Sequence, residues 1–128
     1  MGDVVGLHQV AQHVEDLDRA VRFYEDVLGL RLIARFDPPG LAFFDLGDTR
    51  LLLEAGAPSA LLYLCVADPA ATAERLREHG VTIEQDAHVI FTDTDGQFGS
   101  AGEDEVMAFF RDSEQNLLAL AGRISAPG

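Results

Sequence analysis

Apolar residues recur at helical spacing in two separate stretches of the chain. The first stretch begins at Asp16 or Asp18, whose carboxylates can cap a helix, and ends at Gly29, which adopts the left-handed C′ conformation without strain. Its apolar positions are Leu17, Ala20, Val21, Tyr24, Val27 and Leu28. The second stretch begins with Asp68 and a proline and runs to His79, which a glycine follows. The pattern therefore predicts two helices.

Shorter segments have the alternation of apolar and polar residues, or the short apolar runs, that predict β-strands. Turn-forming residues separate them at Asp37–Gly40 and at Gly47-Asp48. The expected strands are Val4–Val14, Leu30–Arg35, Leu41–Leu46, Arg50–Glu54, Ala60–Val66, Val81–Glu84 with Ala87–Phe91 beyond a kink, Val106–Arg111 and Leu117–Ala121. The last two strands would close as a hairpin.

The order of one strand, one helix and three strands occurs twice, and part of the sequence repeats with it. Leu41–Asp45 has the sequence Leu-Ala-Phe-Phe-Asp, and Met107–Arg111 has the sequence Met-Ala-Phe-Phe-Arg. Such an internal repeat indicates a duplicated supersecondary unit with a cleft between or within the copies. The sequence therefore predicts an α+β fold of two βαβββ modules, about residues 1–56 and 57–128.

One segment, Thr92–Glu105, has no counterpart of its length in the first module. It is polar, acidic and rich in glycine, so we expect a long loop that is either a lid over a functional site or a mobile hairpin. Its start, Asp93-x-Asp95, suggests a calcium loop. However, Phe98 stands where an EF-hand needs glycine and Asp104 where it needs glutamate, so the pattern excludes that motif.

The formal net charge of −13 narrows the classes of partner. Nucleic acid and anionic membrane surfaces are disfavoured, because basic side chains must neutralise their phosphates. The charge either serves solubility or attracts a cationic ligand. A small organic molecule is therefore a better candidate partner than a polyanion.

Length and hydropathy predict one compact cytoplasmic domain. A chain of 128 residues can form its own core, and no apolar stretch is long enough to span a membrane. The N-terminus lacks the pattern of a secretory signal, so a cytoplasmic location is expected. The single cysteine, Cys65, lies in an apolar run and is expected to be a buried strand residue rather than a nucleophile.

Two sequence motifs resemble those of a known superfamily. Leu7–Val10 followed by Asp16–Leu30 resembles the pattern D-L-x-x-A-x-x-F-Y-x-x-V-L-G, and Ala108–Leu117 resembles the ending A-F-x-x-D-P-D-G-N. The chain is similar, over essentially its whole length, to the vicinal oxygen chelate superfamily of glyoxalases, bleomycin-resistance proteins and dioxygenases. The resemblance implies that the two modules form a cupped mixed sheet. It leaves the activity open, because the superfamily contains several kinds of enzyme and proteins that only sequester drugs.

The resemblance also implies a divalent metal held by one ligand from each of four strands. By the superfamily's spacing the first position is Gln9, an accepted ligand in some glyoxalases, whereas the third is Leu61 and the fourth is Ala119. Overlaying the modules without gaps puts the remaining position at Leu53, and Glu54 would replace it only if the turn differed by one residue. A tight divalent site usually needs three or four protein ligands. We therefore expect the usual metal site to be absent.

Other polar residues could form a regrouped site. His13 is expected to share a strand face with Gln9, and Glu105, Met107 and Phe109 to share a face of the strand that lines the substrate pocket in glyoxalases. Imidazole and carboxylate groups can bind a metal or act as acid and base near neutral pH. The candidates are Glu54 and Glu105 as catalytic groups, His13, Phe43, His88, Met107 and Phe109 as ligand-binding residues, and Gln9, Glu54 and His88 as ligands of any divalent metal.

The aromatic side chains suggest where a ligand would bind. The strands carry Phe36, Phe43, Phe44, Met107, Phe109 and Phe110, of which alternation should place about half in the cup and half against the helices. An aromatic pocket under an acidic rim suits a flat or cationic organic molecule.

The sequence is compatible with two functions. The protein could bind and sequester a small organic molecule without the usual metal site, or it could be a metal-dependent lyase, isomerase or dioxygenase that acts on a vicinal-oxygen substrate. The lack of donor atoms at Leu61 and Ala119 favours binding. The resemblance implies a homodimer in either case.

Overall fold

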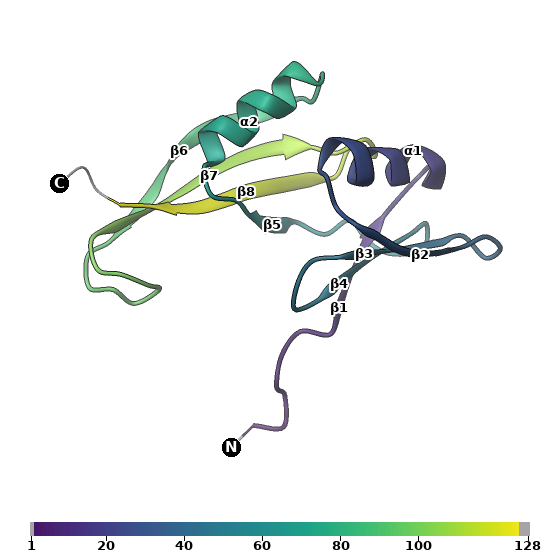
Figure 1. Ribbon diagram of the computed structural model, residues 1–128, viewed down its shortest axis with the longest axis horizontal. Coiled ribbons are helices and arrows are strands. Elements are labelled where there is room, and N and C mark those ends of the chain that lie inside the picture. Colours follow the sequence, from purple (N-terminus) through teal and green to yellow (C-terminus); the bar gives the residue numbers. More distant parts are fainter. Residues whose placement is uncertain (1, 126–128) are drawn as a thin grey trace. The chain divides into compact units, whose positions relative to one another are not determined.

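The computed structural model of the protein describes residues 2–125 (Figure 1). These residues form two compact units that divide in the sequence between Ala60 and Leu61, slightly later than the module boundary expected near residue 56. Each unit has a strand, a helical segment and three further strands, and each has its own four-stranded sheet. The predicted α+β fold of two βαβββ modules is confirmed.

The first unit contains β1 (Gln9–His13), α1 (Leu17–Arg22), a π-helical turn η1 (Phe23–Val27), β2 (Leu32–Phe36), β3 (Leu41–Asp45) and β4 (Arg50–Glu54). Its sheet has the order β1-β4-β3-β2, in which β1 runs parallel to β4 and the other neighbours are antiparallel. The first strand is shorter than the predicted Val4–Val14. Gln9 already pairs with Arg50, the first residue of β4, so earlier residues have no strand beside them.

The helical segment of the first unit begins and ends close to the predicted residues. The Asp16 carboxylate caps it by accepting a hydrogen bond from the Arg19 amide at 3.1 Å. Gly29 follows the segment with a φ of +76°, in the left-handed region that glycine adopts readily. The last turn is wider than an α-helical turn, because the Leu28 amide donates to the Phe23 carbonyl.

The second unit contains β5 (Leu62–Cys65), α2 (Pro69–Glu78), β6 (Ile83–Asp93), β7 (Glu103–Arg111) and β8 (Leu117–Ile124). Its sheet has the order β5-β8-β7-β6, in which β5 runs parallel to β8, so the topology of the first unit is repeated. Asp68 caps α2 through the Ala71 amide, and Gly80 ends it with a φ of +83°. Both features agree with the sequence prediction. No helix within residues 2–125 is long and apolar enough to cross a membrane.

The predicted loop Thr92–Glu105 is partly strand, because both β6 and β7 extend into it. Buried Asp93 organises the turn that remains, since its carboxylate accepts hydrogen bonds from the Gln97 and Phe98 amides at 2.8 and 2.9 Å. The prediction of a long loop was therefore wrong in extent. The ends of β6 and β7 consist of polar and acidic residues that pair through their backbones. The hydrophobic pattern therefore gave no sign of these strand ends.

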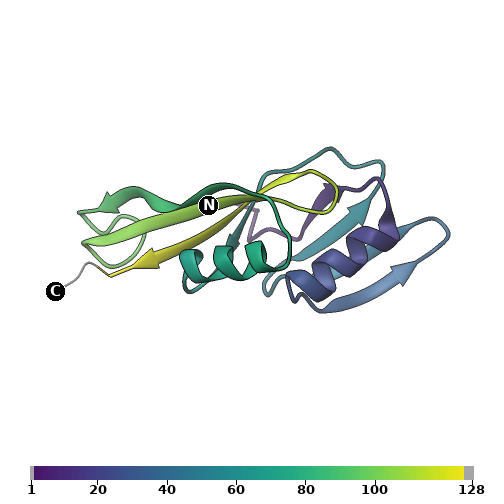
Figure 2. The same ribbon diagram turned by 90° about the horizontal axis from the view of Figure 1, so that it is seen from above.

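Each sheet packs one face against its own helix (Figures 1 and 2). The large side chains buried between sheet and helix include Tyr24, Phe44, Leu51 and Leu53 in the first unit and Leu76, Phe110, Leu118 and Leu120 in the second. Burying one such side chain contributes about 1.5–3 kcal/mol to stability. We call the other side of each sheet, which faces away from the helix, its open face.

Strand alternation sorts the aromatic residues as the sequence predicts. Phe44 and Phe110 are buried against the helices, whereas their neighbours Phe43 and Phe109 lie on the open faces.

Cys65 contradicts its prediction, because its side chain is exposed. It lies on the open face with Tyr63, since Leu62 and Leu64 pair with the core residues of β8 and take the helix-facing positions. An apolar run in a sheet with only one covered face therefore still sends alternate residues outward.

Candidate functional site

Strand pairing shows which open-face positions of the two units correspond. Phe43 pairs with Leu52 in the first unit, and Phe109 pairs with Ala119 in the second, so Leu52 is the counterpart of Ala119. The gapless sequence overlay pointed to Leu53 instead, because the β3–β4 turn is shorter than the β7–β8 turn. Leu53 is fully buried on the helix-facing side, and this finding corrects the overlay.

The four positions expected to hold the superfamily's metal do not fit a divalent ion. With Leu52 in place of the expected Leu53, they are Gln9, Leu52, Leu61 and Ala119, of which only the first has a donor atom in its side chain. The Gln9 side-chain oxygen accepts a hydrogen bond from Arg50 Nε at 2.7 Å, so a guanidinium already lies beside this oxygen. A second cation at that oxygen would be repelled, and the three remaining side chains cannot ligate it.

The other predicted metal ligands are not brought together within one unit. Gln9 lies opposite Arg50, and Glu54 lies opposite His13, so the two candidates are at different ends of the β1–β4 pair. Strands rise about 3.3 Å per residue, which separates these levels by about 13 Å, whereas metal–oxygen bonds measure about 2.0–2.6 Å. His88 belongs to the second unit. Within residues 2–125 no three His, Cys, Asp or Glu side chains form a group that could hold a metal ion.

The open face of the first unit contains an aromatic hollow of about 240 Å³, which we call the arginine hollow. Phe36 and Phe43 meet edge to face in it, with ring centroids 6.1 Å apart. The guanidinium carbon of Arg50 lies 5.6 Å from the centre of the Phe43 ring, in a cation–π contact. Ile33 and Ala34 complete the lining. The hollow therefore combines apolar walls with one positive charge.

Arg50 has only uncharged partners. Its Nε donates to Gln9 Oε1 at 2.7 Å, and its Nη2 lies 3.4 Å from His8 Nε2. Asp45, which pairs with Arg50 in the sheet, forms its ion pair with Arg31 at 3.3 Å instead. Among the residues that the structure describes, no carboxylate lies within ion-pair distance of Arg50. Its positive charge is therefore not neutralised inside the first unit.

His13, a predicted ligand-binding residue, is held by its own unit. Its Nδ1 lies 2.9 Å from the Ala55 carbonyl oxygen, and its Nε2 lies 2.7 Å from a Glu15 carboxylate oxygen. The hydrogen bond with Glu15 raises the pKa of His13 above 6.5, although desolvation opposes the shift. These contacts occupy both ring nitrogens, so contact between His13 and a ligand remains a prediction.

Glu54, a predicted catalytic and metal-binding residue, lies on the open face opposite His13. Its carboxylate has no hydrogen bond or ion pair with another of residues 2–125. A carboxylate in this setting is free to accept a proton or a hydrogen bond from a bound molecule.

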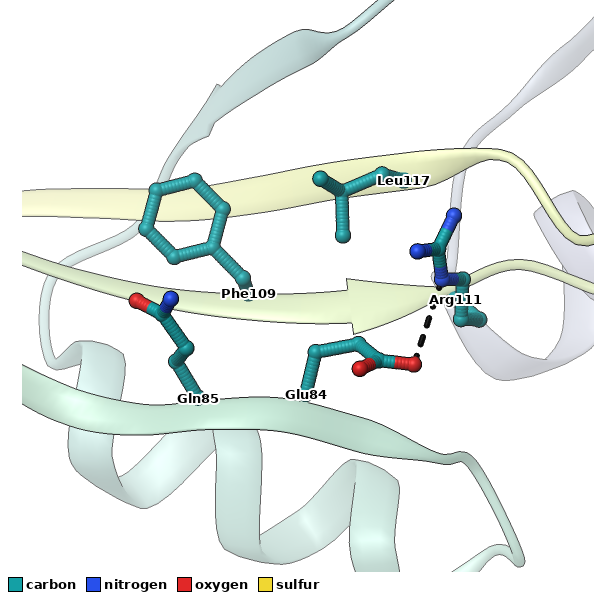
Figure 3. Close-up of a pocket in the computed structure, with 5 residues that line it drawn as sticks. All are labelled: Glu84, Gln85, Phe109, Arg111 and Leu117. Carbon is teal, nitrogen blue, oxygen red and sulfur yellow. Dashed lines mark hydrogen bonds and ion pairs between the residues drawn. The ribbon is translucent and has the colours of Figure 1, made fainter.

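The corresponding hollow of the second unit has different chemistry (Figure 3). It measures about 280 Å³ and is called the glutamate hollow below. Phe109 repeats the phenylalanine of the arginine hollow, but Leu117 stands in place of the arginine. Figure 3 shows the Glu84 carboxylate turned toward Arg111, whose Nε donates to it at 3.2 Å, and the Gln85 amide beside the Phe109 ring. The two charges neutralise each other.

A further hollow on the same open face, of about 350 Å³, has Cys65 and Glu105 in its lining. Arg123 also lines it, and its guanidinium forms ion pairs with Asp93, Glu103 and Glu105 at 2.7, 3.0 and 3.2 Å. Burial alone would raise the pKa of the Asp93 carboxyl, but two backbone amides and Arg123 hold it below its usual value. One arginine meets three carboxylates here, so this part of the second unit is negatively charged.

Three predicted ligand-binding residues of the second unit do lie on one face. His88 pairs with Met107 across β6 and β7, and Phe109 follows Met107 on the same side of β7. Glu105, predicted to be catalytic, lies beyond them and is engaged by Arg123. The structure thus places these residues near one another, while their roles remain predictions.

Three arginines of the open faces, Arg50, Arg111 and Arg123, are not among the site residues predicted from the sequence. For Arg50 the signal was present, because Leu51 and Leu53 mark the core side of β4 and alternation then puts Arg50 with Glu54 on the other side. For Arg123 there was none, since it lies beyond the predicted end of its strand.

Comparison with known proteins decides the family. A family model described as the Glyoxalase/Bleomycin resistance protein/Dioxygenase superfamily matches residues 6–120. The chain belongs to this superfamily. The resemblance drawn from the two sequence motifs is thereby confirmed. No curated protein sequence matches the chain.

Solved structures share the superfamily fold at low sequence identity. Lactoylglutathione lyase from Agrobacterium tumefaciens is 21% identical, with a TM-score of 0.66 over 94% of this chain and 96% of that one. TnmS3, an antibiotic binding protein from Streptomyces sp. CB03234, is 22% identical, with a TM-score of 0.69 over 96% and 99%. A superfamily member from Sphaerobacter thermophilus DSM 20745 is 20% identical, with a TM-score of 0.70 over 93% and 98%. These likenesses establish the fold alone, since one neighbour is an enzyme and another is a binding protein.

Proposed function

We propose that this superfamily member binds a small organic molecule on the open faces of its sheets, without the four-ligand metal site. Apolar side chains on the open faces support the proposal. Ile33, Phe36, Leu61 and Tyr63 are 45, 52, 45 and 55% exposed. Apolar residues that gather around hollows, with a few polar groups among them, are the usual lining of small-molecule sites.

The observation that carries the proposal is the chemistry of the four expected metal positions. Leu52, Leu61 and Ala119 replace donor atoms with apolar surface, and Gln9 is already engaged by Arg50. Without ligands for a Lewis acid, the sheet retains a shaped apolar surface that can bind a molecule but has no ion to polarise it. The description of TnmS3 as an antibiotic binding protein is consistent with such a role for the fold.

A second function is a metal-dependent lyase, isomerase or dioxygenase that acts on a vicinal-oxygen substrate. The observation in its favour is Glu54, whose carboxylate lies on the open face without a partner among the described residues. Glu105 would be the second acidic group, although Arg123 engages it at 3.2 Å. We rank this function second because the described residues of neither unit bring together the donor set needed for the metal.

We also propose that the protein forms a homodimer in the cytoplasm and has no nucleic-acid or membrane partner. The exposed apolar residues of the open faces would lose contact with water in a dimer, and the net charge of −13 disfavours phosphate-rich partners. Sedimentation equilibrium should give twice the chain mass. A chain that stays monomeric at all concentrations would contradict the dimer.

Elemental analysis separates the two functions. The full chain is purified without chelator, incubated separately with zinc, nickel and manganese, desalted, and measured beside a Gln9→Ala, Glu54→Ala double variant. We expect substoichiometric metal in both proteins, because the four positions offer one donor side chain. Stoichiometric metal in the wild type that is lost in the variant would contradict a binding-only role.

Thermal unfolding with small aromatic compounds tests binding itself. A ligand that binds only the folded chain raises its stability with concentration, so at least one compound should raise the melting temperature. A Phe43→Ala, Phe109→Ala double variant is the matched control, because it removes the phenylalanine that the two hollows share and leaves the core intact. Conversion of a compound to product during the incubation would favour the second function.

A further inference from the structure

We propose that the arginine hollow binds an aromatic carboxylate, with the carboxylate on Arg50 and the ring against Phe36 and Phe43. This inference rests on the proposed binding function and adds the chemical class of the ligand. It differs from the expectation that the acidic chain prefers a cationic molecule, because that expectation follows from net charge and this inference follows from the local site.

The charge balance of the open-face arginines singles out Arg50. Arg111 is paired with Glu84, and Arg123 is paired with three carboxylates, so neither has a free charge to offer. Among residues 2–125 the only hydrogen-bond partners of the Arg50 side chain are the Gln9 amide oxygen and an imidazole nitrogen of His8. A chain with many more acidic than basic residues would readily supply a carboxylate to this arginine, yet none in the described part of the chain lies within ion-pair distance of it.

The contacts of Arg50 position its guanidinium and leave donors unused. The Gln9 oxygen accepts the Nε hydrogen, and the guanidinium carbon lies over the Phe43 ring, 5.6 Å from its centroid. Both Nη1 hydrogens remain without a partner among the described residues. A planar guanidinium with a free edge matches a planar carboxylate, which can accept two parallel hydrogen bonds.

The walls of the arginine hollow define the rest of the ligand. Phe36 and Phe43 offer an edge and a face to an aromatic ring, and Ile33 and Ala34 add aliphatic contact. The volume of about 240 Å³ lies below the range typical of drug-sized ligands. These features favour a compound with one ring and one carboxylate over a large polycyclic molecule.

Three probes of similar shape and different charge test the inference. Phenylacetate is anionic, phenylacetamide is neutral, and phenethylamine is cationic. Titration of the isotope-labelled full chain, followed by two-dimensional NMR, measures each dissociation constant and shows which residues shift. We expect phenylacetate to bind about 10- to 100-fold more tightly than phenylacetamide, since a hydrogen-bonded charge contributes on that scale. Phenethylamine should bind most weakly, and the shifts should centre on Ile33 and Phe43.

Substitutions assign the preference to Arg50. Arg50→Leu copies the residue that the second unit carries at the corresponding position, Leu117, and should abolish the preference for phenylacetate over phenylacetamide. Arg50→Lys keeps the charge without the planar fork and should retain part of it. Arg77→Leu is the control, because Arg77 is a paired surface arginine that lines neither hollow, and it should leave phenylacetate binding unchanged.

Three results would overturn the proposed binding of an aromatic carboxylate. Equal affinity for phenylacetate and phenylacetamide, or an unchanged preference in Arg50→Leu, would overturn it while leaving the proposed binding function in place. Should Arg50→Leu fail to fold, Arg50→Lys and Phe36→Leu replace it in the test. Arg50→Lys should reduce the preference for phenylacetate, and Phe36→Leu should lower the affinity for all three probes by the same factor. No shift with phenylacetate also overturns the inference, and the metal analysis then judges the proposed function independently.

Discussion

The arginine hollow and the glutamate hollow occupy corresponding places in the two units but differ in charge. Phe43 and Phe109 form the same wall, but Arg50 of the first hollow corresponds to Leu117 of the second. Glu84 introduces an acid where the first hollow is aliphatic, and an arginine neutralises it. One hollow therefore presents an uncompensated positive charge, and the other presents none.

The helix-facing sides of the same sheets show no such difference. Phe44 and Phe110 are both fully buried, and β4 and β8 each place leucines at the paired core positions. Packing against a helix demands apolar side chains of a given volume, whereas the open face imposes no comparable demand. The two units therefore share the packing of their helix-facing sides, and they differ in the side chains of their open faces.

The largest expected effect separates these two sides. Phe44→Ala and Phe110→Ala should each lower the free energy of unfolding by about 3–5 kcal/mol, because they leave cavities in the two cores. Phe43→Ala and Phe109→Ala, one residue away on the open faces, should each cost about 1 kcal/mol. Urea denaturation of the four variants measures the contrast. Equal losses on both sides would show that the open faces are also packed.

A second effect concerns the close packing of β8 against the start of α2. A Cβ on Gly122 would lie 2.6 Å from the Val66 carbonyl oxygen and 2.9 Å from Pro69 Cδ, so Gly122→Ala forces the start of α2 away from β8. We expect a loss of about 1–3 kcal/mol, as for other overpacked sites. Gly56→Ala is the control, because its added Cβ meets nothing within 4 Å. A smaller loss for Gly122→Ala than for Gly56→Ala would mean that the helix start yields easily.

The scaffold was predictable from the sequence because its signals are local. Asp16 and Asp68 cap the helices, Gly29 and Gly80 end them, and strand alternation separates the core side from the open side. The hairpin end near Asp93 was not predictable, since its order depends on Arg123 from another strand. Local patterns carry no information about such a partner.

The candidate site was predictable only in part, for a related reason. Phe43, Met107 and Phe109 follow from alternation, and Leu61 and Ala119 follow from the spacing of the motifs. The first-unit counterpart of Ala119 was misplaced by one residue, because the β3–β4 turn is shorter than the β7–β8 turn and a gapless overlay cannot detect this difference. Arg50 lacks an ion pair because the Asp45 carboxylate pairs with Arg31. The sequence alone does not show which of the two arginines Asp45 would pair with.

A third effect tests the contrast between the paired and the unpaired arginine. Arg123→Leu leaves buried Asp93 without its ion pair, whereas Arg50→Leu leaves no buried acid behind. Arg123→Leu should therefore lower the urea midpoint at pH 7 and Arg50→Leu should change it little. The pKa of Asp93 is lowered below 3.8 in the folded chain, so its stabilisation is present above that value and is lost as pH falls through the folded pKa.

The pH dependence supplies the check on this third effect. The difference between Arg123→Leu and wild type should shrink when denaturation is repeated at progressively more acidic pH, below 3.8. An Asp93→Asn variant should show a smaller loss on acidification than the wild type does. A difference between Arg123→Leu and wild type that is constant with pH would show that Arg123 acts by packing alone.

The smallest effect concerns the far end of the first open face, where His13 and Glu54 correspond to Cys65 and Ala121 of the second unit. The pKa of His13 is raised above 6.5, chiefly by its hydrogen bond with Glu15, so its stabilisation is full below 6.5 and is lost as pH rises through the folded pKa. The unfolding free energy should thus fall slightly from pH 6 toward pH 8, and Glu15→Gln should reduce that fall. NMR titration of the imidazole measures the same shift directly. If Glu15→Gln leaves the pKa of His13 unchanged, the hydrogen bonds with the Ala55 and Ala57 carbonyls raise that pKa, and the ion pair with Glu15 does not.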